Sequence, residues 1–335
     1  MVAIVQDSSV KNIDRPPRYL LAQEVRDLVR AMREGRKPHV PSGEPTLTDL
    51  PFGEALYKAG FFSPPSSFVP AIRHARSEGI PARQWSGNIN QGPTRRNRAL
   101  TIDDVQRGAA VSGRGVVAVG WSLGGMDYSD IAYDAPDLFH HVLTMGSPIA
   151  LTIDQIRTHT NLGAAYAAMQ RLNFLYNWEV VTGWRPLQMR EPIDGVMFSQ
   201  ILPLYDGVVS LEGQRLPFRD GCRTFVVPTT HAGVVTDPTS LALKAHLIRY
   251  GNEGKIPLSI GRGLRSLDSV DAEQDRRRTY HINGGGVRAA LSEHRAQKRG
   301  LGSVHVPCDA MSEDDGRCGH FPPQSVAPSF QRLSK

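Results

Sequence analysis

The chain has 335 residues, of which 40% are apolar and 21% charged, values typical of a globular protein with one large or two modest domains. No apolar run approaches the roughly 20 residues of a membrane helix, and residues 1–19 lack the apolar core of a signal peptide. We therefore expect a cytoplasmic protein without an integral membrane span. The formal net charge is +6, but the basic clusters near the C-terminus have acidic neighbours and no interleaved aromatic residues, which argues against a nucleic-acid partner.

The first predicted element is an amphipathic helix near the N-terminus. Apolar residues recur at helical spacing between residues 18 and 36, and Gly35 with Pro38 ends the pattern. The turn-forming residues of 41–51 then lead into the main fold. We therefore expect residues 1–45 to form a polar N-terminal segment that contains one helix, and residues 46–252 to form the main domain.

Short apolar runs separated by helical patterns predict an α/β fold with a mostly parallel central sheet and flanking helices. The run 115–119 is rich in β-branched residues and has no polar alternation, as expected of a strand buried on both faces. Strands are predicted at 55–57, 115–119, 141–145, 201–205 and 224–227. Helices are predicted at 68–79, 124–135 and 241–248.

Two further segments differ from this pattern. Residues 149–198 contain helical stretches with several aromatic residues, and they exceed the usual length of a connection, so we expect a helical cap inserted over the site. An ordinary crossover with extra helices fits these residues equally well. Residues 253–335 are rich in Gly, Arg, Ser and Pro and show little periodicity apart from a short helical pattern at 287–298. We expect a disordered or peripheral tail there.

The pentapeptide from Gly120 to Gly124 matches the pattern G-x-S-x-G, in which a strand turns sharply into a helix and exposes a serine at the apex. Gly120 and Gly124 are needed at such a turn because a Cβ at either position would crowd the neighbouring strand or helix. The motif lies between a predicted buried strand and a predicted helix, the setting that this turn requires. We therefore expect Ser122 to be a nucleophile; the alternative is a turn in which Ser122 only caps the helix.

A serine hydroxyl needs a histidine to accept its proton and a carboxylate to orient that histidine. In one large class of serine hydrolases the chain order is Ser, acid, His. Asp206 follows the run 201–205 and His231 follows the run 224–227, so both satisfy this order and both lie beyond the carboxyl end of a predicted strand. The alternatives are an ordinary Asp-Gly turn at Asp206 and a surface histidine at His231.

Stabilisation of an oxyanion requires two backbone N–H donors. The residue after the nucleophile, Leu123, supplies the first. The second is expected from the loop after an early strand, and Phe61, directly after Gly60, is in that place. A simple turn at Gly60 is the alternative.

These residues together resemble a lipase- or esterase-like bacterial family of α/β-hydrolases. The matching pieces occur in order between residue 16 and about residue 250, and the serine pentapeptide is the most specific of them. They are Pro16-Pro17, Leu20-Leu21, Glu24, Gly60-Phe61, Gln91-Gly92-Pro93-Thr94, Gly120 to Gly125, Leu143 to Pro148, Asp206 to Val209 and His231-Ala232-Gly233. The sequence departs from the family at Lys58-Ala59, where an apolar residue and a proline usually precede the glycine, and in the polar stretch 84–90.

The resemblance implies hydrolysis of a carboxylic ester without a cofactor, with Ser122, Asp206 and His231 as nucleophile, acid and base. The substrate expected is a small-molecule ester with an apolar acyl group. Acyl transfer by the same triad is one alternative, and a binding or scaffold protein with a weakened oxyanion hole is another. We expect no metal site, since the spacing of His305, Cys308, Cys318 and His320 departs from that of zinc knuckles. The sequence leaves the oligomeric state open.

Overall fold

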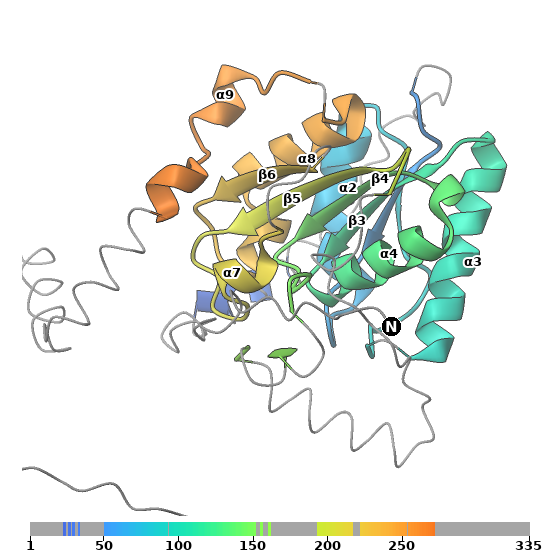
Figure 1. The fold of residues 1–335 in the computed structure, drawn as a ribbon, viewed down its shortest axis with the longest axis horizontal. Coiled ribbons are helices and arrows are strands. Elements are labelled where there is room, and N and C mark those ends of the chain that lie inside the picture. The colour runs from blue at the N-terminus through green and yellow to red at the C-terminus, as the bar shows by residue number, and fades with distance from the viewer. Residues whose placement is uncertain are drawn as a thin grey trace, which may run out of the picture. The chain divides into compact units, whose positions relative to one another are not determined.

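A six-stranded parallel sheet forms the centre of the computed structural model of this chain (Figure 1). The structure describes residues 50–92, 94–151, 193–216, 222–252 and 254–271, together with 23, 24, 26, 27, 29, 30, 33, 155, 156, 160 and 161. The strand order is β2-β1-β3-β4-β5-β6, and each neighbouring pair is parallel. The prediction of a mostly parallel sheet with flanking helices is therefore confirmed.

The structure has all five predicted strands and one that the sequence analysis missed. The strands are β1 (Ala55–Lys58), β2 (Ala82–Gln84), β3 (Val116–Trp121), β4 (Phe139–Met145), β5 (Met197–Pro203) and β6 (Cys222–Val227). All six residues of β3 are buried, because this strand lies in the middle of the sheet with helices on both faces. The missed strand, β2, has only three residues and includes Arg83, and such a short polar strand is suited to the edge of a sheet, where it lies.

Helices cover both faces of the sheet (Figure 1). The longer ones are α2 (Val69–Ser77), α3 (Arg95–Ser112), α4 (Leu123–Asp134) and α8 (Pro238–Tyr250). Residues of α2 and α8 share one apolar cluster with Val117 and Val119, whereas residues of α3 and α4 share a second cluster with Val116 and Ala118. Alternate side chains of β3 thus enter opposite layers of the core, as the period of a strand requires.

Helix α3 was not predicted, because the side that it buries is largely polar. Its buried residues are Asn97, Thr101, Asp104, Val105 and Gly108. Such a face lacks the apolar repeat that marks an amphipathic helix. The helix begins after Thr94, whose side chain accepts a hydrogen bond from the Asn97 N–H, and ends at Gly113 with a positive φ.

Described residues outside the predicted main domain at 46–252 also take part in the fold. Near the N-terminus, the described residues between 23 and 33 are helical, within the predicted helix 18–36. After the predicted boundary at 252, Ile260 joins the apolar core, Arg265 forms an antiparallel bridge to Val226, and Val270 is buried. The predicted cap at 149–198 ends inside β5, and most of its residues lie outside the described part of the chain. The predicted tail beyond residue 271, with its helical pattern at 287–298, also lies outside it. None of the described helices is long and apolar enough to cross a membrane.

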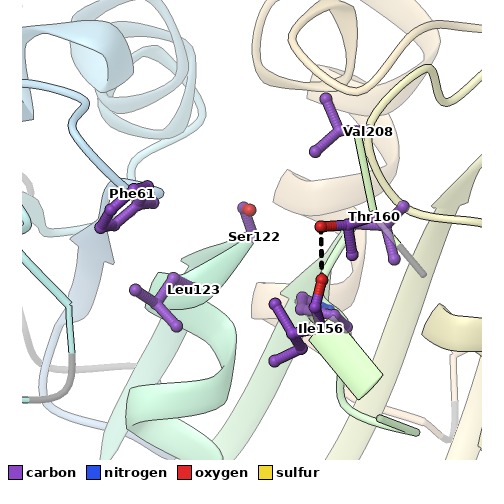
Figure 2. A pocket seen from close by; sticks show the side chains of 8 residues that line it. Phe61, Ser122, Leu123, Ile156, Thr160 and Val208 are labelled. Atoms are coloured by element: carbon purple, nitrogen blue, oxygen red, sulfur yellow. Dashed lines mark hydrogen bonds between the residues drawn. The ribbon is translucent and has the colours of Figure 1, made fainter. Parts of the chain in front are cut away.

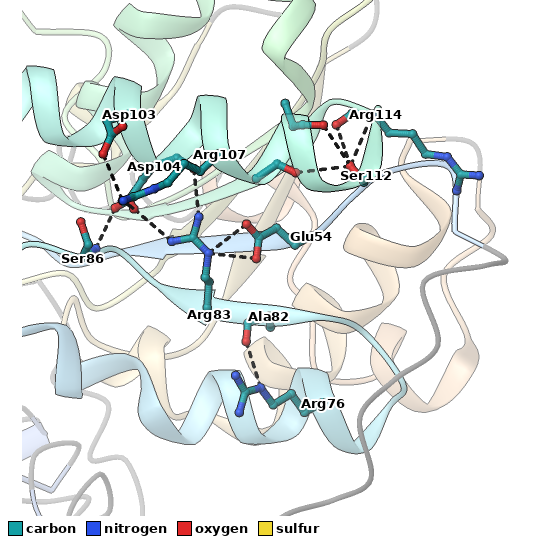
Figure 3. Close-up of polar contacts among 12 residues, drawn as sticks. Glu54, Arg76, Ala82, Arg83, Ser86, Asp103, Asp104, Arg107, Ser112 and Arg114 are labelled. Carbon is teal, nitrogen blue, oxygen red and sulfur yellow. Dashed lines mark hydrogen bonds and ion pairs between the residues drawn. The ribbon is translucent and has the colours of Figure 1, made fainter.

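An ionic network joins the edge strand β2 to α3 (Figure 3). Arg83 places Nε at 2.9 and 3.0 Å from the two carboxylate oxygens of Glu54, and its Nη1 lies 3.1 Å from Oδ1 of Asp104. Asp104 is fully buried and also accepts hydrogen bonds from the Ser86 N–H at 2.7 Å and from Arg107 at 2.6 Å. Burial alone would raise the pKa of Asp104, but the hydrogen bonds from Ser86, Arg107 and Arg83 outweigh it and leave the pKa lowered.

We predict that Asp104→Asn lowers the free energy of unfolding by about 3 kcal/mol at pH 7, because it leaves the Arg83 guanidinium without its buried partner. Since the pKa of Asp104 is lower in the folded protein than its ordinary value of 3.8, the stabilisation is present above about pH 4 and is lost as the pH falls through the folded-state value. Urea unfolding of wild type and variant should therefore converge below pH 4.

Asp103→Asn is the matched control on the same helix. The Asp103 side chain is 57% exposed and pairs only with Arg107, at 3.2 Å, so its loss should change stability by less than about 0.5 kcal/mol. Equal effects of the two substitutions would contradict the assignment of the network as a stabilising feature.

Candidate active site

Ser122 occupies the sharp turn between β3 and α4, with φ of 54° and ψ of −124°. Among the described residues, only Ser122 and Phe62 combine a positive φ with a side chain, and such backbone strain is held only where the surroundings enforce it. The Ser122 N–H donates to the Met145 carbonyl at the end of β4 over 2.8 Å, and the Ser122 carbonyl accepts from the Gly125 N–H at 3.1 Å. The turn is therefore held by the neighbouring strand and by the first turn of α4.

The two glycines of the pentapeptide lie where no side chain fits. A Cβ on Gly120 would be 2.3 Å from Cα of Gly125, and a Cβ on Gly124 would be 2.3 Å from the carbonyl oxygen of Lys58 in β1. Both contacts are with backbone, which cannot move aside as the tip of a side chain can. The turn into α4 thus depends on glycine at both positions.

Asp206 and His231 form a buried pair at the same edge of the sheet. Asp206 follows β5, His231 follows β6, and Oδ2 of Asp206 lies 2.7 Å from Nδ1 of His231. The other oxygen of Asp206 accepts the backbone N–H groups of Val208 and Val209 at 2.8 and 2.7 Å. This arrangement leaves the second ring nitrogen of His231, Nε2, on the side away from the carboxylate.

The loop of His231 is fastened to the turn that carries Ser122. Trp121, the residue before the serine, donates from its indole nitrogen to the His231 carbonyl at 2.8 Å, and the two rings lie 5.4 Å apart. Gly146, with φ of 56°, makes room for the pair, since a Cβ there would be 2.9 Å from Nδ1 of His231. Residues from β3, β4 and the loop after β6 therefore meet at one place.

The parallel sheet, the strained serine between β3 and α4, and the chain order of serine, acid and histidine at one sheet edge occur together in a single superfamily architecture. The chain has the α/β-hydrolase fold. In this fold, a turn of this kind between a strand and a helix is called a nucleophile elbow.

The electrostatics of the pair favour protonation of His231. Burial lowers the pKa of the imidazole, but the charge and hydrogen bond of Asp206 and the charge of Glu24 outweigh burial, so the pKa is raised above 6.5. The imidazole is therefore neutral, and able to accept a proton, only at a pH above this raised value.

Phe61 and Leu123, the two expected oxyanion donors, lie near Ser122 and line the same pocket (Figure 2). Leu123 is the first residue of α4, a position whose N–H has no partner within the helix. Gly60 packs on the serine so closely that a Cβ would be 2.9 Å from Cβ of Ser122. The loop after β1 turns at Gly60, where the Ser63 N–H donates to the Gly60 carbonyl at 3.1 Å.

The two departures from the family pattern have distinct outcomes in the structure. Lys58 is fully buried on the side of α3 and α4, where Nζ pairs with Asp127 at 2.7 Å, donates to Thr101 at 2.6 Å and lies 4.7 Å from the Trp85 ring. It therefore forms an ion pair two residues before the turn at Gly60. Asn90, at the end of the polar stretch 84–90, holds this turn by hydrogen bonds with Ala59 and Phe62.

Asn90, Gln214 and Glu24 support the site, and the sequence analysis assigned no role to any of them. The Asn90 side-chain amide donates to the Ala59 carbonyl at 2.8 Å, and the main-chain carbonyl of Asn90 accepts from the Phe62 N–H at 2.8 Å. Gln214 donates to Oδ2 of Asp206 at 2.9 Å. The polarity of 84–90 was a visible signal for Asn90, whereas Gln214 lies in a four-residue helix with no distinctive pattern.

An apolar pocket, with about 380 Å³ of empty space that includes open solvent, adjoins Ser122 (Figure 2). Its other lining residues are Phe61, Leu123, Pro148, Ile156, Thr160, Val208 and Val209. The hydroxyl of Thr160 is occupied by a hydrogen bond to the Ile156 carbonyl at 2.7 Å, so it does not present a free donor to the pocket. The pocket suits an apolar group bound beside the serine.

The described residues contain no group of three or more His, Cys, Asp or Glu side chains that could hold a metal ion. The four residues His305, Cys308, Cys318 and His320 lie outside the described part of the chain.

Comparison with known proteins finds no matching family model and no matching curated protein. Among solved structures, the chain is similar to lipase B of Aspergillus fumigatus, at 16% identity over 69% of this chain and 59% of that chain, with a TM-score of 0.47. It is also similar to a pyrethroid hydrolase, at 13% identity over 61% and 100% of the two chains with a TM-score of 0.44. A carboxylesterase from Bacillus subtilis shares 12% identity over 70% and 99% of the chains, with a TM-score of 0.41. The chain thus spans less than two thirds of the fungal lipase, and these identities say nothing of the reaction.

We predict that Asp206→Asn lowers the pKa of His231, because it removes the negative charge that stabilises the imidazolium. The measurement is an NMR titration of the imidazole signals, with His231→Gln used to assign the resonance. His140→Gln, at a half-buried position that makes no contact with Asp206, should leave the His231 titration in place. An unchanged His231 midpoint in Asp206→Asn would show that the pair is not coupled in solution.

Proposed function

We propose that this chain is a serine hydrolase that cleaves a carboxylic ester through an acyl-enzyme. The observation that carries the proposal is the buried pair of Asp206 and His231, 2.7 Å apart, beside a serine in a strained nucleophile elbow. A carboxylate that fixes an imidazole next to an activated serine is the arrangement required for nucleophilic acyl transfer.

In this reaction Ser122 Oγ attacks the ester carbonyl while His231 Nε2 accepts the hydroxyl proton. Asp206 holds the Nδ1 proton and so keeps Nε2 available as the base. The N–H groups of Leu123 and Phe61 stabilise the oxyanion of the tetrahedral intermediate. The protonated His231 then gives its proton to the leaving alcohol, and a water molecule, activated by the same imidazole, releases the carboxylic acid and restores Ser122.

The proposed substrate is a small-molecule ester with an apolar acyl group. Apolar side chains supply most of the pocket wall beside Ser122, which suits an apolar acyl group. The same acyl-enzyme also permits transfer to an added alcohol or amine, and analysis of the products with and without such an acceptor distinguishes transfer from hydrolysis.

We predict that a fluorophosphonate adds its mass once to the wild-type protein and not to Ser122→Ala, and that the variant loses at least about 10⁴-fold in ester hydrolysis. Intact-protein mass spectrometry and an ester panel make the measurement. Ser147→Ala is the matched control, since Ser147 is also a buried serine after a neighbouring strand. Folded wild-type protein that takes up no label would refute the proposed function.

We predict that Ile156→Phe shortens the acyl chain that is accepted, because the larger ring fills the pocket beside Ser122. The ratio of kcat/KM for an octanoate ester to that for an acetate ester should fall by about 10-fold. Val111→Phe introduces the same ring at a position on α3 that is 80% exposed and does not line the pocket. A ratio that stays constant in Ile156→Phe would place the acyl group elsewhere.

A further inference from the structure

One acidic side chain of the N-terminal helix reaches both loops that carry the Asp206–His231 pair. Glu24 is 5% exposed, and its Oε1 accepts the N–H of Gly207 at 2.7 Å and the N–H of His231 at 2.8 Å. Its Oε2 accepts the N–H of Ala232 at 2.7 Å. A single carboxylate therefore bonds both to the residue after the acid and to the base itself, which lie 183 and 207 positions after Glu24 in the sequence.

These three hydrogen bonds determine how the two loops lie against each other. The bond between Asp206 and His231 requires that their loops, which follow different strands, keep a fixed separation. An uncharged acceptor at residue 24 with one oxygen would leave at least one of the three buried N–H groups without a partner, which is unfavourable. A carboxylate offers enough lone pairs for all three.

The charge of Glu24 also acts on the imidazole. Among the described residues, Asp206 and Glu24 are the charged groups that raise the pKa of His231. Burial and the charge of Asp206 raise the pKa of Glu24, whereas the charge of His231 and the hydrogen bonds from Gly207 and Ala232 lower it. Because both carboxylates carry a negative charge that raises the pKa of His231, removing either charge should favour the neutral imidazole.

We propose that Glu24 is a positioning residue for the serine hydrolase reaction, holding the loops of Asp206 and His231 in register with Ser122. This inference rests on the proposed function and extends it to a helix that lies about 100 residues before the nucleophile in sequence. Glu24 touches no reacting atom and acts only through Asp206 and His231.

A neighbouring contact of the same helix provides the matched control. Asp27 accepts the hydroxyl of Thr230 at 2.6 Å, and that hydroxyl in turn accepts the Gly233 N–H at 2.9 Å. Asp27 thus fastens the helix to the same loop, but it makes no hydrogen bond to the backbone of Asp206, Gly207 or His231 among the contacts described. Asp27→Asn tests the docking of the helix without removing the carboxylate that spans both loops.

For Glu24→Gln we expect kcat to fall by about 10- to 100-fold with KM changed by less than about twofold. The acidic limb of the pH profile of kcat/KM should move to lower pH, because loss of the negative charge lowers the pKa of His231. Glu24→Asp keeps the charge, but its side chain is too short to reach both loops. Its kcat should therefore fall, while the acidic limb of its pH profile should stay at the wild-type position. Asp27→Asn should keep both the wild-type limb and most of kcat.

The NMR titration of His231 supplies a readout that does not depend on turnover, and circular dichroism reports folding of each variant. A His231 midpoint and a pH limb that both stay at wild-type values in folded Glu24→Gln would overturn the role of Glu24. If Glu24→Gln does not fold, wild-type kcat in Glu24→Asp would overturn it instead. Failure of wild-type protein to react with fluorophosphonate would refute the hydrolase proposal itself, whatever the Glu24 variants do.

Discussion

The turn from β3 into α4 requires close contacts between backbone segments that only glycine permits, at Gly120 and at Gly124. Gly124 lies against the carbonyl of Lys58 in β1, and Gly120 lies against Gly125 at the start of α4. This contact forces Ser122 into its positive φ and directs its side chain to the carboxyl edge of the sheet. The turn at Gly60, the pocket and the loop of His231 all adjoin this one turn.

Around the turn, the protein buries several charged groups and satisfies each with hydrogen bonds. Asp206 accepts bonds from two backbone N–H groups, from Gln214 and from His231, while Glu24 accepts three from the backbone. Removing a charge from water is costly unless such partners replace the solvent. The saturation of both carboxylates by backbone donors explains how they can lie near one another in a buried site, on loops that follow different strands.

Buried polar groups also stabilise the protein away from the serine, and they do so on the side of the sheet covered by α3 and α4. Asp104 joins α3 to the edge strand β2, and Lys58 joins β1 to Asp127 of α4. Each of these buried charged residues, Asp104 and Lys58, connects a helix to a strand. Together with apolar packing, they therefore determine how α3 and α4 lie on the sheet. The opposite face, covered by α2 and α8, is packed mainly by apolar residues.

The sequence by itself was sufficient for the parallel sheet and for the chain order of serine, acid and histidine. Buried strands such as β3 are continuous apolar runs, and the serine pentapeptide has a local steric cause, so both are readable from neighbouring residues. The missed elements, β2 and α3, bury Arg83 partly and Asp104 fully, and these two residues are stabilised by each other and by Glu54 and Ser86. No local pattern shows such a pairing.

Only the tertiary structure decided which distant residues support the site. Glu24, Asn90 and Gln214 are common polar residues to which the surrounding sequence assigns no role, and each acquires one only because folding places it beside Phe62, Asp206 or His231. Ile260 and Val270, which follow residue 252, join the core for the same reason, since they are isolated apolar residues that find partners in separate clusters. Periodicity and motifs report interactions between near neighbours in the chain, whereas these contacts join residues far apart in it and depend on the completed sheet.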